Sequence, residues 1–137
     1  MAEQHTLHYV THGHSTHEIT RDIAAIVQKS EIDVGVVHLF VRHTSCGLAL
    51  TENADPDVRR DLQTLLGRWA PDGDPEYRHR IEGDDDMAAH ARSVLTGCSV
   101  SLPFAHRHLL LGHWQGIYLF EHRAQGHRRE VIVTLLG

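Results

Sequence analysis

The stretch from Asp33 to His43 constrains the fold most strongly, because β-branched and apolar side chains face both ways along it. This pattern is typical of a strand inside a sheet that is covered on both faces. Ser45-Cys46-Gly47 interrupts the strand, and Leu48 to Thr51 resumes it. Such a strand needs neighbours, and the last third of the sequence supplies them: we predict strands at residues 99–103, 108–111, 115–122 and 130–136.

Two longer helices are predicted in the first half of the chain. The residues Ser15 to Glu18 match a capping box, and apolar residues at helical spacing follow them, which predicts a helix up to about Ser30. Asp55 as the N-cap and Pro56 at the first helical position begin a second helix, which ends near Trp69.

A short third helix is predicted between Asp84, as its cap, and Gly97. The preceding residues, Ala70 to Gly83, form the longest irregular stretch, and long loops of this kind are often functional. One more strand is predicted at Gln4 to Thr11, where polar and apolar residues alternate. Since helices come early and strands late, we predict an α+β fold with largely antiparallel sheets and helices on one face.

Charge and hydropathy restrict the partners. The 137 residues include 13 basic and 18 acidic side chains, and the formal charge of −5 opposes binding to nucleic acid or a membrane surface. No apolar run approaches the roughly 20 residues that a membrane helix needs. The N-terminus lacks the pattern of a secretory signal, so we expect a cytoplasmic protein with neither nucleic-acid nor membrane partners. The length favours a single domain over residues 1–137.

Histidine is unusually frequent, with 14 residues. It is the commonest metal ligand and the usual proton shuttle near neutral pH, so its number favours metal binding or acid–base chemistry. Five histidines lie near the N-terminus at irregular spacing, across a strand, a turn and a helix start. We interpret these five as solvated side chains: His5, His8, His12, His14 and His17.

Six short motifs occur in order along nearly the whole chain: His43-Thr44-Ser45, Glu52 to Pro56, Tyr77 to His79 with Glu82-Gly83, Asp85 to Met87 with His90, Gly112 to Ile117, and Glu121 to Arg123 with Gly126. Together they resemble the YjbQ family, which is also described as uncharacterised protein family 0047 and as a secondary thiamine-phosphate synthase family. The resemblance implies a three-layer α/β/β fold, a homotrimer packed about a three-fold axis, and weak thiamine-phosphate synthase activity.

Three positions depart from the pattern of the family. Arg107 stands where the family has a glycine, so we expect a different turn there. His113 replaces a threonine beside the Trp-Gln signature, which removes any role of that hydroxyl. Ala88 replaces a proline, a change that costs little because alanine favours helices.

The resemblance also implies a polar metal-binding cluster, to which we assign His43, His79 and His90 as ligands. Three protein ligands and one open position are typical of catalytic zinc sites. Asp86 lies one helical turn before His90 and is either a fourth ligand or a carboxylate that orients an imidazole. A divalent metal is therefore the predicted cofactor. Zinc is favoured, and magnesium is the alternative because pyrophosphate chemistry commonly uses it.

Three more residues, Ser45, Glu121 and Arg123, are predicted to handle the substrate. Ser45 and Thr44 offer hydroxyl groups that can bind an anion. A role of Ser45 or Cys46 as a nucleophile is less favoured, because the sequence around them lacks the Gly-x-Ser-x-Gly nucleophile elbow. Glu121 is assigned as a general base or as a partner of metal-bound water. Arg123 is assigned as a clamp for phosphate, because its guanidinium group matches phosphate oxygens. We interpret Asp84 and Asp85, which precede Asp86, as capping or solvated acids.

The reaction of the resembled family joins an aminopyrimidine pyrophosphate to a thiazole phosphate and expels pyrophosphate. Magnesium with oxygen ligands suits that chemistry, whereas three histidines suit zinc. We therefore predict a metal-binding homotrimer whose partner is a small phosphorylated metabolite. Thiamine-phosphate synthesis would then be a side activity. Two alternatives remain open: a zinc-dependent hydrolase or lyase of a small phosphorylated metabolite, and a non-enzymatic trimer that binds metal or metabolite.

Overall fold

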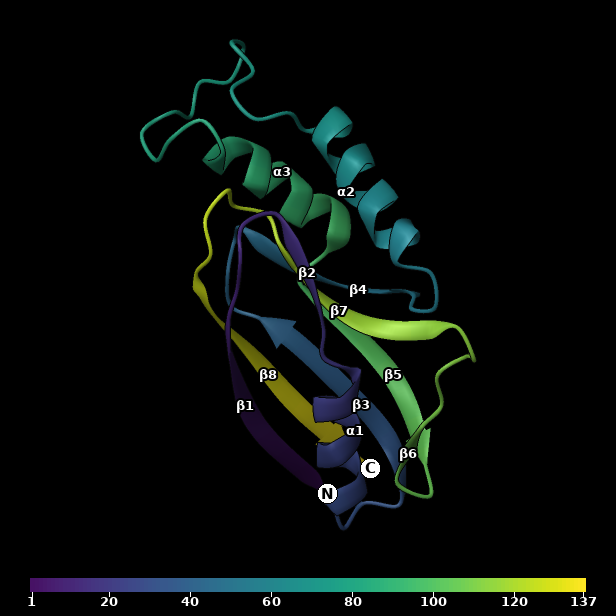
Figure 1. The fold of residues 1–137 in the computed structure, drawn as a ribbon. Helices are drawn as coiled ribbons and strands as arrows, with labels where there is room; N and C mark the ends of the chain where they lie inside the picture. Colours follow the sequence, from purple (N-terminus) through teal and green to yellow (C-terminus); the bar gives the residue numbers. More distant parts are fainter.

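In the computed structural model of residues 1–137, β3 (Val34–Val41) occupies the centre of a five-stranded sheet, as the sequence predicts (Figure 1). Its neighbours are β8 (Arg128–Leu136) and β5 (Ser99–Ala105). The outer strands are β1 (Ala2–Val10) and β6 (His108–Leu109). All pairings are antiparallel, so the predicted sheet type is confirmed.

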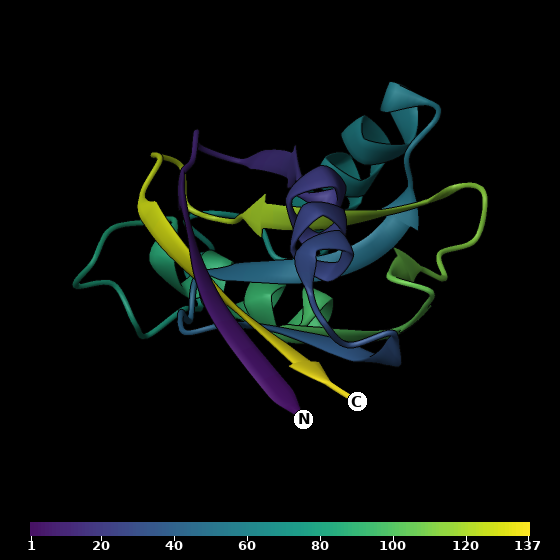
Figure 2. The same ribbon diagram turned by 90° about the horizontal axis from the view of Figure 1, so that it is seen from below.

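A second antiparallel sheet has β7 (Gln115–Glu121) at its centre, between β2 (Ser15–Glu18) and β4 (Cys46–Glu52). β4 begins inside the interruption that we predicted at residues 45–47. The five-stranded sheet curls like half a barrel, and the three-stranded sheet lies against its concave side (Figure 2). With the helices, the two sheets give the predicted α+β class.

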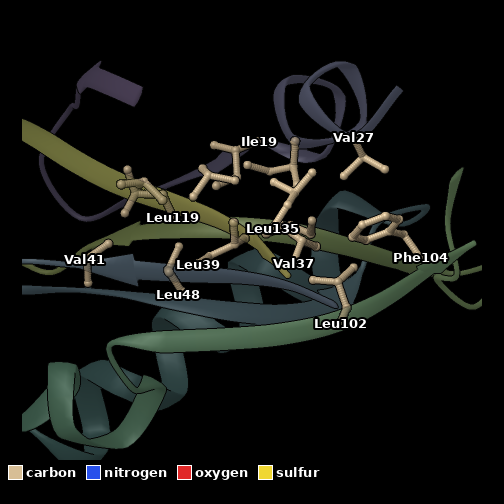
Figure 3. Close-up of a cluster of buried hydrophobic side chains, with 14 of the residues drawn as sticks. Ile19, Val27, Val37, Leu39, Val41, Leu48, Leu102, Phe104, Leu119 and Leu135 are labelled. Carbon is tan, nitrogen blue, oxygen red and sulfur yellow. The ribbon is translucent and has the colours of Figure 1, made fainter. Parts of the chain in front are cut away.

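The main hydrophobic core fills the concave side of the curled sheet (Figure 3). Because side chains alternate along a strand, every second residue of β3 and β8 points into it, for example Leu39 and Val133. α1 (Thr20–Lys29) also packs into this space through Ile23 and Val27, on the apolar face that the sequence predicts. α1 therefore lies inside the curl, whereas the other two helices lie outside it.

α2 (Pro56–Trp69) covers the outer face of the three-stranded sheet, where Leu66 packs against Tyr118 and Phe120. It begins as predicted, since the Asp55 side chain accepts a hydrogen bond from the second amide of the helix. No helix in the chain has both the length and the apolar character that a bilayer span requires.

α3 (Asp86–Thr96) crosses the same face very closely. A Cβ atom on Gly47 of β4 would lie 1.9 Å from a hydroxyl oxygen of α3, so only glycine permits this approach. The predicted cap at Asp84 is wrong. The N-cap position belongs to Asp85, and its carboxylate binds Arg123 instead of a helix amide.

The capping-box prediction for Ser15 to Glu18 is also wrong. These residues form β2, which pairs with β7, and α1 starts only afterwards with Ile19 as an N-cap that makes no side-chain bond. The Glu18 carboxylate accepts a hydrogen bond from the Thr20 hydroxyl at 2.8 Å. Pairing with a central strand satisfies more main-chain groups than a helix cap does, so sheet formation prevails.

The convex face of the five-stranded sheet carries no helix. Val36 and Phe40 of β3 point outward there and are 42% and 39% exposed, and Leu136 of β8 is 50% exposed. β3 has apolar residues on both sides, but the hydrophobic core covers only one of them. In a single chain, the other apolar side faces solvent.

The hairpin between β5 and β6 yields a prediction about stability. His106 (φ 51°) and Arg107 (φ 60°) both have left-handed backbones, as in a two-residue type I′ turn that favours glycine at its second position. We expect Arg107→Gly to raise the free energy of unfolding by about 1 kcal/mol or less, measured by chemical denaturation, because the strain exceeds the added entropy of the unfolded chain. Arg107→Ala keeps a Cβ atom and should not stabilise. An equal gain in both variants would show that the arginine charge, and not the backbone, is the cause.

Candidate metal site

Two imidazole rings meet one carboxylate at the start of α3. Asp86 Oδ2 lies 2.7 Å from His79 Nε2 and 2.9 Å from His90 Nε2. Asp86 and His90 are one turn apart, so they project from the same side of the helix. His79 comes from the long loop, residues 70–85. The three ligand atoms lie within 4.8 Å of one another, so this part of the predicted cluster does assemble within one chain.

The hydrogen bonds of His90 show what its side chain can bind. Nδ1 lies 2.8 Å from the main-chain carbonyl oxygen of Thr44, which can only accept, so Nδ1 carries a hydrogen. In a neutral ring, Nε2 then presents a lone pair directly to Asp86, which is also an acceptor. Either a proton or a metal ion must lie between them. A carbonyl that fixes the ring in this way is typical of histidines that bind metals.

Arg123 holds the carboxylates of the cluster in place. Its Nη1 lies 3.1 Å from Asp86 Oδ1, and its Nε donates to Asp85 Oδ2 at 2.8 Å. This bond from Arg123 lowers the pKa of Asp85 to about 2. Burial would raise the pKa of Asp86, but the bond to His79 and the charges of His90 and Arg123 outweigh it and lower the pKa. Both acids are therefore ionised at neutral pH, as a ligand carboxylate must be.

This arrangement changes two interpretations from the sequence. Asp85 occupies the N-cap position of α3, but its carboxylate neither caps a helix amide nor faces solvent alone, because it is paired with Arg123 and accepts a bond from the Ala124 amide. Arg123 also donates to the Glu82 carbonyl, so its guanidinium group is already occupied on three sides. The contacts of Arg123 fit a residue that positions Asp86, and the predicted phosphate clamp would require those bonds to break.

A second cluster is buried between the two sheets. Glu121, at the end of β7, is 0% exposed and binds Arg129 of β8 through both oxygens, at 2.8 and 2.5 Å. The Thr11 hydroxyl and the Arg123 amide also donate to it, at 2.6 and 3.1 Å. Burial alone would raise the pKa of Glu121, but these donors outweigh it and lower the pKa. A carboxylate so enclosed fits a structural ion pair better than the predicted general base.

Ser45 belongs to this buried ion pair. Arg129 Nη2 donates to the Ser45 hydroxyl at 3.0 Å and to its main-chain carbonyl at 3.1 Å. The neighbouring Cys46 lies in the core, where burial raises the pKa of its thiol to about 11. Neither side chain is placed to attack a substrate.

His43 does not join the other two histidines. Its Nε2 accepts a hydrogen bond from the main-chain amide of Glu130 at 2.9 Å, just beyond the last pairing of β3 with β8. Burial lowers the pKa of His43, and the charge of Arg129 lowers it further. The group able to hold an ion consists of His79, Asp86 and His90. Two of the three predicted ligands thus come together with Asp86, whose role the sequence left open.

Two buried arginines, Arg129 and Arg92, hold segments of this region together. Arg129 alternates in step with the inward-facing residues of β8, so its spacing along the strand was a sequence signal for the buried ion pair that it forms. Arg92 of α3 was missed altogether. It donates to the Ala70 carbonyl at 2.8 Å and pairs with Asp72 at 3.3 Å, so it anchors the start of the loop that carries His79.

The buried ion pair predicts the behaviour of Glu121→Gln. Because the variant leaves the Arg129 charge unpaired, we expect the free energy of unfolding at pH 7 to fall by about 3 to 5 kcal/mol. The folded pKa of Glu121 lies below its ordinary value of 4.5, so its stabilisation is complete above that pH and is lost as the pH falls through the folded pKa. The difference between wild type and variant should therefore shrink in acid.

Urea denaturation at pH 7 and at about pH 3.5 measures this difference, and Glu76→Gln, at an exposed carboxylate, is the matched control. If Glu121→Gln abolished turnover without any loss of stability, Glu121 would have a chemical role and the structural interpretation would be wrong.

Known proteins match the chain over almost its full length. The family described as "UPF0047 protein YjbQ-like" matches residues 5–137. The UPF0047 protein sll1880 of Synechocystis is 46% identical over 134 residues, which are 98% of this chain and 91% of that protein. The UPF0047 protein YjbQ of Escherichia coli O157:H7 is 38% identical over 135 residues, which are 98% of this chain and 97% of that protein.

Solved structures share the fold of this chain. The conserved hypothetical protein TT1486 of Thermus thermophilus is 39% identical and superimposes with a TM-score of 0.85, over 96% of this chain and 98% of that one. A YjbQ-like protein of Sulfolobus solfataricus shares the fold at 22% identity, with a TM-score of 0.86. The chain therefore belongs to the YjbQ-like UPF0047 family.

Proposed function

We propose that the protein binds one divalent transition metal ion through His79, Asp86 and His90 and acts there on a small phosphorylated metabolite. The orientation of His90 carries the proposal. Its Nδ1 is committed to the Thr44 carbonyl, so its Nε2 lone pair faces the carboxylate, and a cation between them satisfies both groups. Two imidazole nitrogens and one carboxylate oxygen are a donor set that catalytic zinc sites use with a position left open.

The surrounding residues prepare this donor set before any ion arrives. The bond to His79 and the charges of His90 and Arg123 keep Asp86 ionised, and the helix aligns it with His90. The anchored loop brings His79 to the same oxygen. A bound divalent ion would supply Lewis-acid chemistry to a phosphoryl or carbonyl oxygen of the substrate. The protein itself contributes orientation, so little reorganisation accompanies binding.

The donor set also bears on which reaction is the main one. Magnesium prefers oxygen ligands in octahedral geometry, whereas two imidazoles favour zinc or a similar ion. This supports thiamine-phosphate synthesis, which the family resemblance implies, as a weak secondary activity. The open position of a zinc-like site favours a second candidate, a zinc-dependent hydrolase or lyase of a phosphorylated metabolite. Turnover that chelation abolishes and zinc restores would support the second candidate, and magnesium-dependent turnover would support the first.

Assembly is part of the proposal. The uncovered apolar side of β3 and β8 supports a homotrimer in which this convex face packs against other copies of the chain. Exposed apolar patches on soluble proteins commonly mark such contacts. A trimer would complete the cover on both faces that the sequence of β3 predicts.

The metal proposal predicts one tightly bound zinc ion per chain of untagged protein, measured by elemental analysis and calorimetric titration. His90→Ala removes a ligand and should weaken zinc binding by more than the roughly 10- to 100-fold that losing an outer-shell partner costs. Arg123→Gln removes such a partner and should fall within that range. His5→Ala changes an exposed histidine of β1 and is the control. Unchanged zinc affinity in His90→Ala would refute the assigned site.

The assembly proposal predicts a particle of about 46 kDa, three times the 15.5 kDa chain, in light scattering. Phe40→Lys places a charge on the convex face and should shift the mass toward the monomer. Trp69→Lys changes an exposed aromatic residue at the end of α2, away from that face, and should leave the mass unchanged. A wild-type mass equal to one chain at micromolar concentration would contradict the trimer.

A further inference from the structure

We infer that the Nδ1–H group of His43 is a fixed, uncharged hydrogen-bond donor that binds a phosphoryl oxygen of the substrate beside the metal cluster. The inference rests on the proposed function, because it places this donor next to the ion that His79, Asp86 and His90 would hold. It gives His43 a role different from the ligand role that its sequence motif suggests.

The hydrogen on His43 is located by a main-chain donor. The amide of Glu130 can only donate, and it points at His43 Nε2 from 2.9 Å. Nε2 must therefore carry the lone pair, and the ring hydrogen is on Nδ1. An imidazolium ring would set two hydrogens against each other at this contact. The main-chain amide of Glu130, near the start of β8, thus selects the neutral form of His43 that carries its hydrogen on Nδ1.

Nδ1 of His43 is free to bind a ligand. It has no partner in the protein, and it is not among the buried polar atoms that lack one, so it is accessible. His43, Thr44 and His90 line a depression of about 580 Å³. His43 and the proposed metal ligand His90 therefore line the same depression. A ligand small enough to enter can contact both.

The other residues that line the depression indicate how a substrate would lie in it. The depression is also lined by Ser93 and Val94 of α3 and by Gly97 and Cys98 just after it, and the Ser93 hydroxyl already donates to the Cys46 carbonyl. The polar end of a substrate would therefore lie at His43 and Thr44. No arginine or lysine lines the depression, so the negative charge of a phosphate must be balanced by the ion on His90. A neutral N–H group then adds direction without requiring protonation.

Two simpler roles for His43 compete with this one. The side chain could serve only to satisfy the Glu130 amide where β3 has stopped pairing with β8. It could also turn and become a third imidazole ligand. The three roles use different nitrogen atoms, so substitutions that keep one nitrogen position and delete the other separate them.

The test uses His43→Gln and His43→Asn in the full chain, with zinc and inorganic phosphate as probes. A glutamine amide reaches the position of Nε2 and can still accept from Glu130, but it leaves no donor at Nδ1. We expect zinc affinity to be retained and phosphate affinity of the zinc-loaded protein to fall by about 10- to 100-fold, as for a bond to a charged acceptor. An asparagine amide reaches the Nδ1 position, so His43→Asn should keep more phosphate affinity and lose stability.

Each other outcome overturns the inference in a distinguishable way. If His43→Gln loses zinc, His43 is a ligand, and the proposed function stands without this inference. If the variant keeps both zinc and phosphate, His43 only caps the Glu130 amide. If wild-type protein binds no zinc, the proposed function fails at the first titration, and the inference falls with it. Nitrogen-15 NMR of the metal-free protein is an independent readout, since a hydrogen on Nε2 would also refute the proposal.

Discussion

The buried ion pair between Glu121 and Arg129 is the interaction on which the rest of the structure depends. It joins the last residue of β7 to the start of β8, and so ties the two sheets together at the edge of the core. Unpaired charges at such depth are strongly destabilising, so the pair forms only when both sheets are in place. Thr11, Ser45 and the amide of Arg123 satisfy its remaining groups, and the first two draw two more segments to the same point.

The candidate metal site is built outward from that point. The segment after Glu121 carries Arg123 to the start of α3, where it holds Asp86. The segment before Ser45 presents the Thr44 carbonyl that orients His90. The ion pair and the histidine cluster therefore share two short pieces of chain, residues 43–45 and 121–123. This explains why the motifs containing Ser45 and Glu121 look functional in sequence, although their side chains hold the scaffold.

Much of the fold and part of the site could be predicted from local patterns. Apolar residues on both sides of residues 33–43 identified β3 as the central strand, and Asp55 with Pro56 placed the start of α2 correctly. The four-residue spacing of Asp86 and His90 put both side chains on one helical face, where the structure has them. The family motifs were also sufficient to name the family that the comparisons show.

Patterns among neighbouring residues are enough to predict strands, a helix cap and two ligands one turn apart. Contacts between distant segments depend on how the whole chain folds. β2 formed a strand because β7 offered it a partner, despite the capping pattern of Ser15 to Glu18. His43 turned to the Glu130 amide, 87 residues away, and so left the histidine cluster. Local periodicity acts over a few residues, whereas the need to satisfy each buried amide and charge acts across the whole fold.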